Sequence, residues 1–209
     1  MLKIATILPY KENYTFSKAA AASLWVYDFY KYSKFKKNNY IFGCTDTKDY
    51  LSKNYININV NNIKSKFSSS TTKYCNNFIK KNKNIKFDII EIHNRPLVFN
   101  YLNNKVNSKF ILYFHNDPIS MKGSKNINER LFLLNNVEKI IFVSKWVQKR
   151  FFVGLDQKLV NKTSVVYPSI HVDKKTVKKE KKIVFVGKLN RSKGYDIYRD
   201  AILKILDDF

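Results

Sequence analysis

Residues 88–118, DIIEIHNRPLVFNYLNNKVNSKFILYFHNDP, decide the fold class of this chain. The runs Asp88–His93 and Phe110–His115 are short and rich in isoleucine and aromatic residues, and the second is continuously apolar through Ile-Leu-Tyr-Phe. Such runs are typical of strands that are buried on both faces of a parallel sheet. Pro96 suits the first position of a helix over 96–104, because the amide hydrogen that proline lacks would be unpaired there.

The same alternation of strands and helices continues in both directions along the chain. Strands are also expected at Lys3–Leu8, Tyr40–Cys44, Ile56–Val60, Lys139–Ser144, Ser164–Tyr167 and Lys182–Gly187. Helices are also expected at Ser17–Phe35, Thr71–Lys81, Asn128–Asn135 and Lys145–Phe152. This order predicts an α/β protein with a Rossmann-like, doubly wound parallel sheet.

A second domain is expected to begin near the end of the chain. The polar, Lys-rich segment His171–Glu180 is typical of a linker, so we expect one domain over 1–172, a linker over 173–181 and a new domain from 182. One strand and one amphipathic helix cannot bury a core of their own. We therefore expect a truncated second Rossmann-like domain. The apolar positions of its helix are Ile197, Ala201, Ile202, Ile205 and Leu206.

Composition excludes several classes of protein. A hydrophobic content of 44% excludes wholesale disorder, and 5 Gly with 4 Pro exclude collagen-like and low-complexity chains. No apolar run is long enough to cross a bilayer, and the N-terminus MLKIATILPYKEN does not resemble a signal peptide. We expect a cytoplasmic protein. Cys44 and Cys75 lack metal-ligand spacing and are expected to be reduced thiols.

The formal charge of +23 favours anionic partners without naming one. Lysine supplies most of it and the chain holds five arginines, whereas proteins that recognise nucleic acid favour the bidentate arginine side chain. Residues 50–87 hold eight lysines and no acidic residue. They form either a solvated helix with its loops or a patch that faces phosphates or the anionic surface of a membrane. A basic module that binds nucleic acid or anionic surfaces without catalysis stays open as the alternative function.

Two polar clusters follow neighbouring predicted strands. His93 lies in Glu91–Pro96 and His115 in Phe114–Pro118, and the third histidine of the chain is His171. Open α/β sheets place their ligand crevice at the carboxyl ends of strands, although a histidine there is often purely structural. We expect His93 and His115 to face a shared cleft. No histidine spacing suggests a metal, so none is expected.

A basic loop, Gly187-Lys-Leu-Asn-Arg-Ser-Lys-Gly194, follows the last predicted strand. It is either a diphosphate cradle at a helix N-terminus or an ordinary solvated loop. It is not a P-loop, and the chain also lacks the GxGxxG fingerprint of dinucleotide-binding enzymes and the GxSxG elbow of serine hydrolases.

In order along the chain, several of these segments resemble the retaining family 4 group of bacterial glycosyltransferases of the GT-B fold. The opening KIATILPY resembles the first strand of that family, and DIIEIHNRP and KFILYFHNDP resemble its strand ends with histidine. EKIIFVSKWVQKRF resembles the next strand and helix, and VVYPSIHVD follows where the family often has "V-I-P-N-G-V-D". KIVFVGKLNRSKGYDIYRDAI resembles the "F-V-G-R-L-x-x-x-K-G" start of the donor domain.

The resemblance implies roles for particular residues. His115 matches the active-site histidine that contacts the transferred sugar, and Lys188 and Lys193 would hold the diphosphate of the nucleotide-sugar donor. The remaining candidates would line the cleft from the acceptor domain, and they are His93, Asn94, Arg95, Asn116 and Asp117. No cofactor is implied, because the nucleotide sugar is a substrate.

The resemblance also implies an activity, although the chain departs from the family's sequence pattern at several points. The activity is metal-independent transfer of a sugar, of hexosyltransferase type, to a cell-envelope glycan such as lipopolysaccharide or to a lipid-linked acceptor, with peripheral association with an anionic membrane. The chain departs from the family because KENYTFSK replaces the glycine-rich first loop, and Lys188 stands in place of arginine. The carboxylates of the family's "E-x7-E" segment would lie beyond Phe209, so the chain alone is expected to transfer no sugar.

Overall fold

The computed structural model describes residues 2–10, 12–60, 69–169, 180 and 182–207. The chain divides into two units, Met1–Ile170 and His171–Phe209, called unit 1 and unit 2 below. Except for Glu180, the predicted linker 173–181 lies outside the described residues, as does His171.

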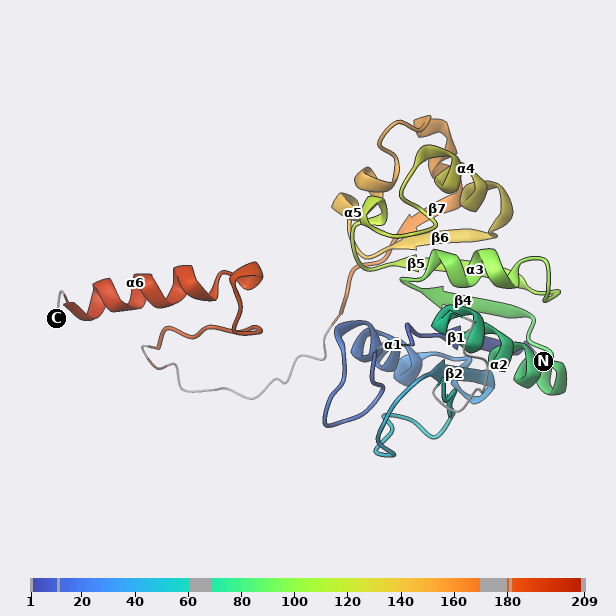
Figure 1. Cartoon of the computed structure of the whole chain (residues 1–209), viewed down its shortest axis with the longest axis horizontal. Helices are drawn as coiled ribbons and strands as arrows, with labels where there is room; N and C mark the ends of the chain where they lie inside the picture. Colours follow the sequence, from blue (N-terminus) through green and yellow to red (C-terminus); the bar gives the residue numbers. More distant parts are fainter. Residues whose placement is uncertain (1, 11, 61–68, 170–179, 181, 208–209) are drawn as a thin grey trace. The chain divides into compact units, whose positions relative to one another are not determined.

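Unit 1 is built on a parallel sheet of seven strands in the order β3-β2-β1-β4-β5-β6-β7 (Figure 1). This confirms the predicted Rossmann-like α/β fold. Most strand ends differ from the expected ones by one or two residues. The strands are β1 (Ile4–Ile7), β2 (Asn39–Gly43), β3 (Tyr55–Asn57), β4 (Ile89–His93), β5 (Lys109–Phe114), β6 (Lys139–Phe142) and β7 (Thr163–Val165).

The helices of unit 1 also form where the sequence predicts them. They are α1 (Ala21–Tyr32), α2 (Ser70–Ile85), α3 (Pro96–Leu102), α4 (Ile127–Asn136) and α5 (Lys145–Phe151), with short 3-10 turns η1 (Lys36–Asn38), η2 (Pro118–Ser120) and η3 (Gln157–Lys162). Pro96 is the first residue of α3, as expected. The first helix begins at Ala21 rather than Ser17, because the Ser17 hydroxyl and amide both donate to Asp49 in a preceding turn.

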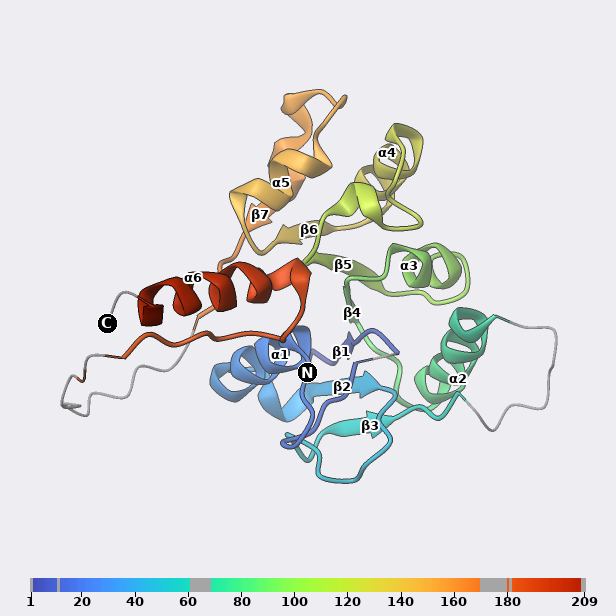
Figure 2. The same cartoon turned by 60° about the vertical axis from the view of Figure 1, so that its left-hand side comes forward.

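The two faces of the sheet differ in what they bury. Figure 2 shows α1 on one side of the sheet and α2 and α3 on the other. On the α2 and α3 side, Phe110, Leu112 and Phe114 of β5 join one large apolar core. On the α1 side, the intervening Tyr113 joins a smaller cluster with Trp25. Because both faces are covered at β5, its sequence is an uninterrupted apolar run.

Unit 2 corrects one expectation. The predicted strand Lys182–Gly187 does not form, because no described strand pairs with it and a strand exists only through its ladder of hydrogen bonds. The predicted helix does form, as α6 (Tyr195–Asp207), after a 3-10 turn η4 (Arg191–Lys193). Phe185 packs against the rings of Tyr195 and Tyr198, with centroids 5.5 and 5.3 Å away. Ile197 and Leu206 stay exposed.

Candidate functional site

The order of the strands fixes where unit 1 can hold a ligand. From β1 the chain continues to β2 and β3 on one side, and β4 and the later strands lie on the other. The switch point therefore lies between β1 and β4, and ligands of open α/β sheets bind at the carboxyl ends of the strands beside it. The loops that leave β1, β4 and β5 meet this edge of the sheet.

The two strand-end histidines are in direct contact there. His93 ends β4, His115 follows β5, and the His93 Nδ1 atom lies 2.9 Å from His115 Nε2. His93 is only 1% exposed and stacks on the Tyr113 ring at a centroid distance of 4.3 Å. The edge of Trp25 packs against His115 at 5.2 Å. The tertiary fold thus joins two residues that are separated by a whole helix in the sequence.

Burial makes this histidine pair neutral. Burial lowers the pKa of His93, and the neighbouring His115 lowers it further. Burial also lowers the pKa of His115, to about 4. Two neutral imidazoles share one hydrogen bond, with one nitrogen as donor and the other as acceptor. His93 Nε2 is buried and has no hydrogen-bond partner among the described residues, so this nitrogen can form one further hydrogen bond.

Asn94 links the end of β4 to the end of β5 through hydrogen bonds. Its backbone has a φ of 55°, in the left-handed region that asparagine tolerates better than most residues. Its amide donates to the Tyr113 carbonyl at 2.8 Å, and its side-chain oxygen accepts from the amides of His115 and Asn116 at 3.0 and 3.3 Å. Asn94 therefore sets the position of the backbone that carries His115. The sequence predicted Asn94 near the cleft but gave no sign of this role.

Arg95 and Asn94 line a cavity of about 740 Å³ at the same edge of the sheet. The cavity is open to solvent between the loop after β1, the first turn of α2 and the start of α3. The Arg95 guanidinium lies over the Tyr10 ring, 5.6 Å from its centroid. Further lining residues include Ser69, Thr71, Thr72, Tyr101, Ser120, Met121 and Lys122.

His93 lines a different cavity, of about 370 Å³, between α1 and the sheet. Thr6, Glu91 and Tyr113 form a hydrogen-bonded row on this face: the Thr6 hydroxyl lies 2.8 Å from Glu91 Oε2, and the Tyr113 hydroxyl lies 3.3 Å from Oε1. Burial raises the pKa of Glu91, and these two hydrogen bonds act in the opposite direction. This row was not among the expected site residues. The signal for it was the polar residue between the isoleucines of Ile-Ile-Glu-Ile, which alternation directs to one face.

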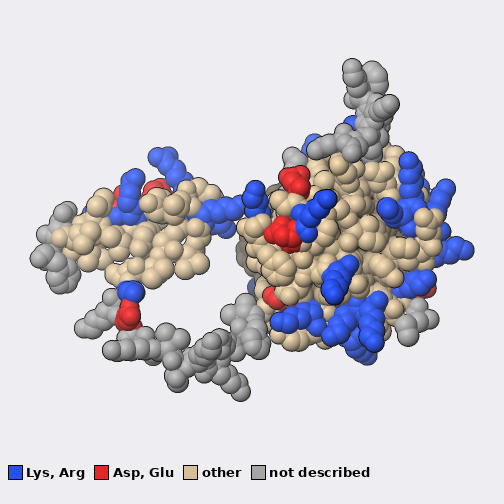
Figure 3. Space-filling view, turned by 90° about the horizontal axis from the view of Figure 1, so that it is seen from below, with Lys and Arg blue, Asp and Glu red and all other residues tan. Residues whose placement is uncertain are grey.

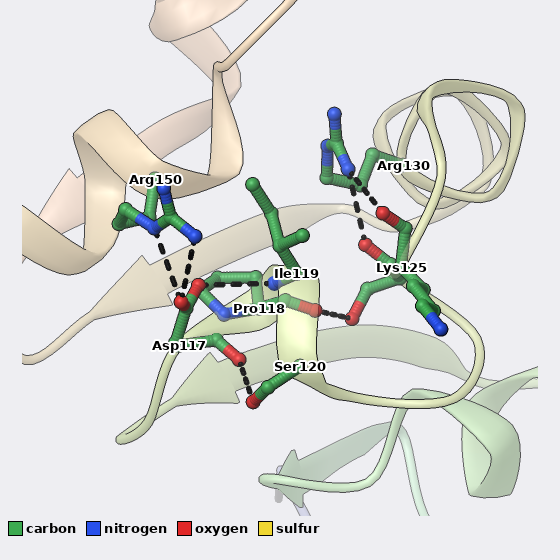
Figure 4. A network of polar contacts seen from close by, with 8 residues as sticks. Asp117, Pro118, Ile119, Ser120, Lys125, Arg130 and Arg150 are labelled. Atoms are coloured by element: carbon green, nitrogen blue, oxygen red, sulfur yellow. Dashed lines mark hydrogen bonds and ion pairs between the residues drawn. The ribbon is translucent and has the colours of Figure 1, made fainter.

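Asp117 holds the loop after β5 in place (Figure 4). Its Oδ2 atom accepts from Arg150 Nη2 at 2.9 Å, and its Oδ1 atom accepts from the Ile119 amide at 3.1 Å. Burial acts to raise the pKa of Asp117, but these hydrogen bonds outweigh it and the pKa is lowered. Its carboxylate is thus engaged within the fold, whereas the side chain of Asn116 is exposed.

Arg130 completes this network from α4. It donates to the carbonyls of Ser124, Lys125 and Val153 at 3.3, 2.9 and 2.6 Å. These bonds tie the segment after η2 to the end of α5, and the segment carries Lys122 of the larger cavity.

The basic loop of unit 2 presents its cations to solvent. Lys188 and Lys193 are both exposed, and Gly194 ends η4 with a left-handed φ of 72°. The basic loop is followed by a helix, as predicted.

The described residues also bear on other kinds of site. They hold no group of three or more His, Cys, Asp or Glu side chains that could bind a metal. Burial raises the pKa of the free thiol of Cys75 to about 12. None of the described helices combines the length and the apolar character that a membrane span requires. On the face of unit 1 seen in Figure 3, lysines and arginines gather along the lower margin and the right-hand edge, with few acidic side chains among them.

No protein-family model matches the sequence, and no curated protein matches it. Solved structures do resemble it. Sucrose-phosphate synthase from Thermosynechococcus elongatus superposes with a TM-score of 0.52 at 12% identity, covering 80% of this chain and 48% of that one. The Anabaena protein HepE, solved in complex with UDP-glucose, gives 0.56 at 14% identity, covering 81% and 44%. The apo lipopolysaccharide outer core galactosyltransferase WaaB gives 0.57 at 16% identity, covering 83% and 47%.

The chain thus spans less than half the length of each of these three proteins. At such low identities the likeness is one of fold. The parallel sheet of unit 1 has the Rossmann-like fold of one half of a GT-B glycosyltransferase.

Proposed function

We propose that this chain is the acceptor-side half, with the start of the donor-side half, of a metal-independent retaining glycosyltransferase of family 4. It moves a sugar from a nucleotide-sugar donor to a cell-envelope glycan or a lipid-linked acceptor at the cytoplasmic face of the membrane. The observation that carries the proposal is the neutral His93–His115 pair, which lies at the carboxyl edge of a GT-B-like sheet beside its switch point.

The neutral state of the pair suits the chemistry of sugar transfer. Cleavage of a sugar–phosphate bond develops positive charge at the anomeric carbon, and a charged imidazolium nearby would oppose that charge. A neutral His115 can instead form a hydrogen bond with a sugar hydroxyl. His93 holds His115 in one orientation through the 2.9 Å contact, so less freedom is lost when the sugar binds.

The departing diphosphate needs positive charge of its own. In this proposal Lys188 and Lys193 supply it, because exposed ammonium groups beside the start of a helix favour phosphate. No carboxylate in the described part of unit 2 is assigned to the sugar and ribose of the donor, so we expect this chain by itself to bind a nucleotide sugar weakly.

Trp25 offers a direct test, because it contacts both histidine rings at centroid distances of 5.5 and 5.2 Å. The exposed Trp146 is the other tryptophan of the chain, so a Trp146→Phe variant leaves Trp25 as the single reporter. We expect UDP-glucose to change Trp25 fluorescence in a saturable way and UDP to change it less. A response that duplex DNA reproduces and that vanishes with rising salt would favour the basic module instead.

Association with an anionic membrane is proposed as a companion property. α2 carries Lys73, Lys80, Lys81 and Lys83 and no acidic residue, while it buries Tyr74, Cys75 and Phe78 against the sheet. Each cation near an anionic surface contributes about 1 kcal/mol, screened by salt. Vesicles with anionic lipid should sediment the chain and neutral vesicles should not. Equal binding to both, or no loss in a variant with Lys80, Lys81 and Lys83 changed to Gln, would contradict the proposal.

A further inference from the structure

The charged side chains that line the 740 Å³ cavity at the carboxyl edge are all positive. Arg95 and Lys122 line it, and no Asp or Glu is among its described lining residues. Hydroxyl groups of Ser69, Thr71 and Thr72 and the amides of Asn94 and Asn100 add groups that can donate hydrogen bonds, whereas the Ser120 hydroxyl already donates to the Asp117 carbonyl. Leu97, Tyr101 and Met121 form an apolar wall beside them. Cations with surrounding hydroxyls and amides recognise phosphate oxygens.

The Arg95 side chain is positioned by the Tyr10 ring and keeps hydrogen-bond donors for a ligand of this cavity. Its guanidinium lies over the Tyr10 ring, and its Nε atom is buried without a hydrogen-bond partner among the described residues. Among the residues that the structure describes, Arg95 forms no ion pair, unlike Arg150, which is bound to Asp117. An arginine fork that is stacked and not paired with a carboxylate can bind a phosphoryl group through two parallel hydrogen bonds.

The negative charge of Glu12 weakens the attraction of Arg95 for an anion. Glu12 interacts electrostatically with Arg95, and burial raises its pKa while Arg95 lowers it. Glu12 does not line the cavity, but its carboxylate competes with an anion for the same guanidinium. Removal of the Glu12 charge should therefore strengthen anion binding, whereas removal of a cavity cation should weaken it.

We propose that this cavity binds a phosphoryl group on the acceptor, so that the acceptor of this enzyme is a phosphorylated molecule. The inference rests on the proposed glycosyltransferase function and names the class of acceptor. Two sources fit the same chemistry: a water-soluble sugar phosphate, or a lipid phosphate whose chain contacts Leu97 and Met121.

The first experiment measures phosphate binding by the full chain. Isothermal titration uses inorganic phosphate, hexose 1-phosphate, farnesyl phosphate in nonionic micelles and, as the neutral control, the free hexose. The Arg95 Nε–H signal in a nitrogen-15 spectrum reports binding at the cavity. We expect one phosphate ester to bind more tightly than inorganic phosphate and to shift this signal, and the ester that does so identifies the source. No advantage over inorganic phosphate, or equal binding of the free hexose, overturns the proposal.

Variants separate the cavity from the general charge of the chain. Lys122→Gln alters an exposed side chain and should weaken phosphate binding about tenfold, and Arg95→Gln should weaken it as much or more. Glu12→Gln should strengthen it. The matched control is Lys83→Gln, because it removes the same charge at the far end of α2 and should leave binding unchanged. If Lys122→Gln and Lys83→Gln bind phosphate equally well, the cavity is not the site.

The outcomes also distinguish this inference from the proposed function. If UDP-glucose leaves Trp25 unchanged while the phosphate ester binds, the chain is a phosphate-binding protein and both the transferase function and the acceptor role fail. If UDP-glucose changes Trp25 but Lys122→Gln binds the ester as the parent does, the transferase proposal stands and the phosphorylated acceptor is excluded.

Discussion

The carboxyl edge of the sheet in unit 1 and the basic loop of unit 2 look alike in the sequence, since each was expected as a strand, a polar loop and a helix. Their structures differ. In unit 1, β4 pairs with β1 and β5, so His93 and Arg95 are surrounded by residues from distant segments. In unit 2 the segment before the loop pairs with no described strand, and Lys188 and Lys193 are exposed. A polar loop forms a structured binding site only when neighbouring strands bury and orient its side chains.

The largest expected effect tests whether the basic loop acts despite its exposure. In a protein that joins this chain to a complete donor half, Lys193→Ala should slow sugar transfer about 10²–10³-fold, because it removes a charge that stabilises the departing diphosphate. A transfer assay with radiolabelled nucleotide sugar measures this. His115→Ala should slow the same reaction. The matched control is Lys204→Ala near the end of α6, which should transfer at the parent rate; an equal loss in Lys204→Ala would refute the assignment.

The second prediction concerns the pH dependence of unit 1. The folded pKa of His115 is about 4, against 6.5 for the free side chain, so the unfolded chain binds more protons between these values. Stability should therefore fall as the pH drops from about 6.5 to about 4, by about 3 kcal/mol for His115. Urea unfolding at a series of pH values measures it.

His115→Gln provides the control for this prediction, because glutamine has no charge to gain. Glu91 and Glu12, whose raised pKa values act in the opposite direction, titrate in parent and variant alike. The difference between the two curves isolates the contribution of His115 together with its effect on His93, because His93 is present in both proteins. Curves that run parallel from pH 6.5 to 4 would show that His115 titrates normally.

A third, smaller effect is expected at Asn94. Asn94→Ala removes the acceptor for two backbone amides and places alanine at a φ of 55°, so it should lower the free energy of unfolding by about 2 kcal/mol. Asn94→Gly loses the same acceptor but tolerates the backbone, so it should be less destabilising. If both variants unfold at the same urea concentration, backbone strain is not part of the cost.

The smallest effect is expected in the basic loop. Lys188→Ala removes an exposed side chain and should change the free energy of unfolding of unit 1 by less than about 0.5 kcal/mol. The same urea series measures it, with Asn94→Ala as the positive reference. A loss as large as that of Asn94→Ala would show that the loop supports the fold.

The sequence alone determined the sheet and its helices. Apolar runs such as Phe110–His115 and punctuation such as Pro96 are local signals, and each strand or helix forms where its own residues favour it. The same signals predicted a strand at Lys182–Gly187, which fails because pairing requires a second segment that local residues cannot supply.

Only the tertiary structure decided which polar residues meet. The contact of His93 with His115, the ion pair of Asp117 with Arg150 and the cavity that joins Arg95 to Lys122 each bring together segments from different elements. Their pairing depends on the order and register of the strands, which alternation within one strand does not encode. Composition and periodicity determine how each segment folds, and long-range packing determines the burial and charge that give the site its chemistry.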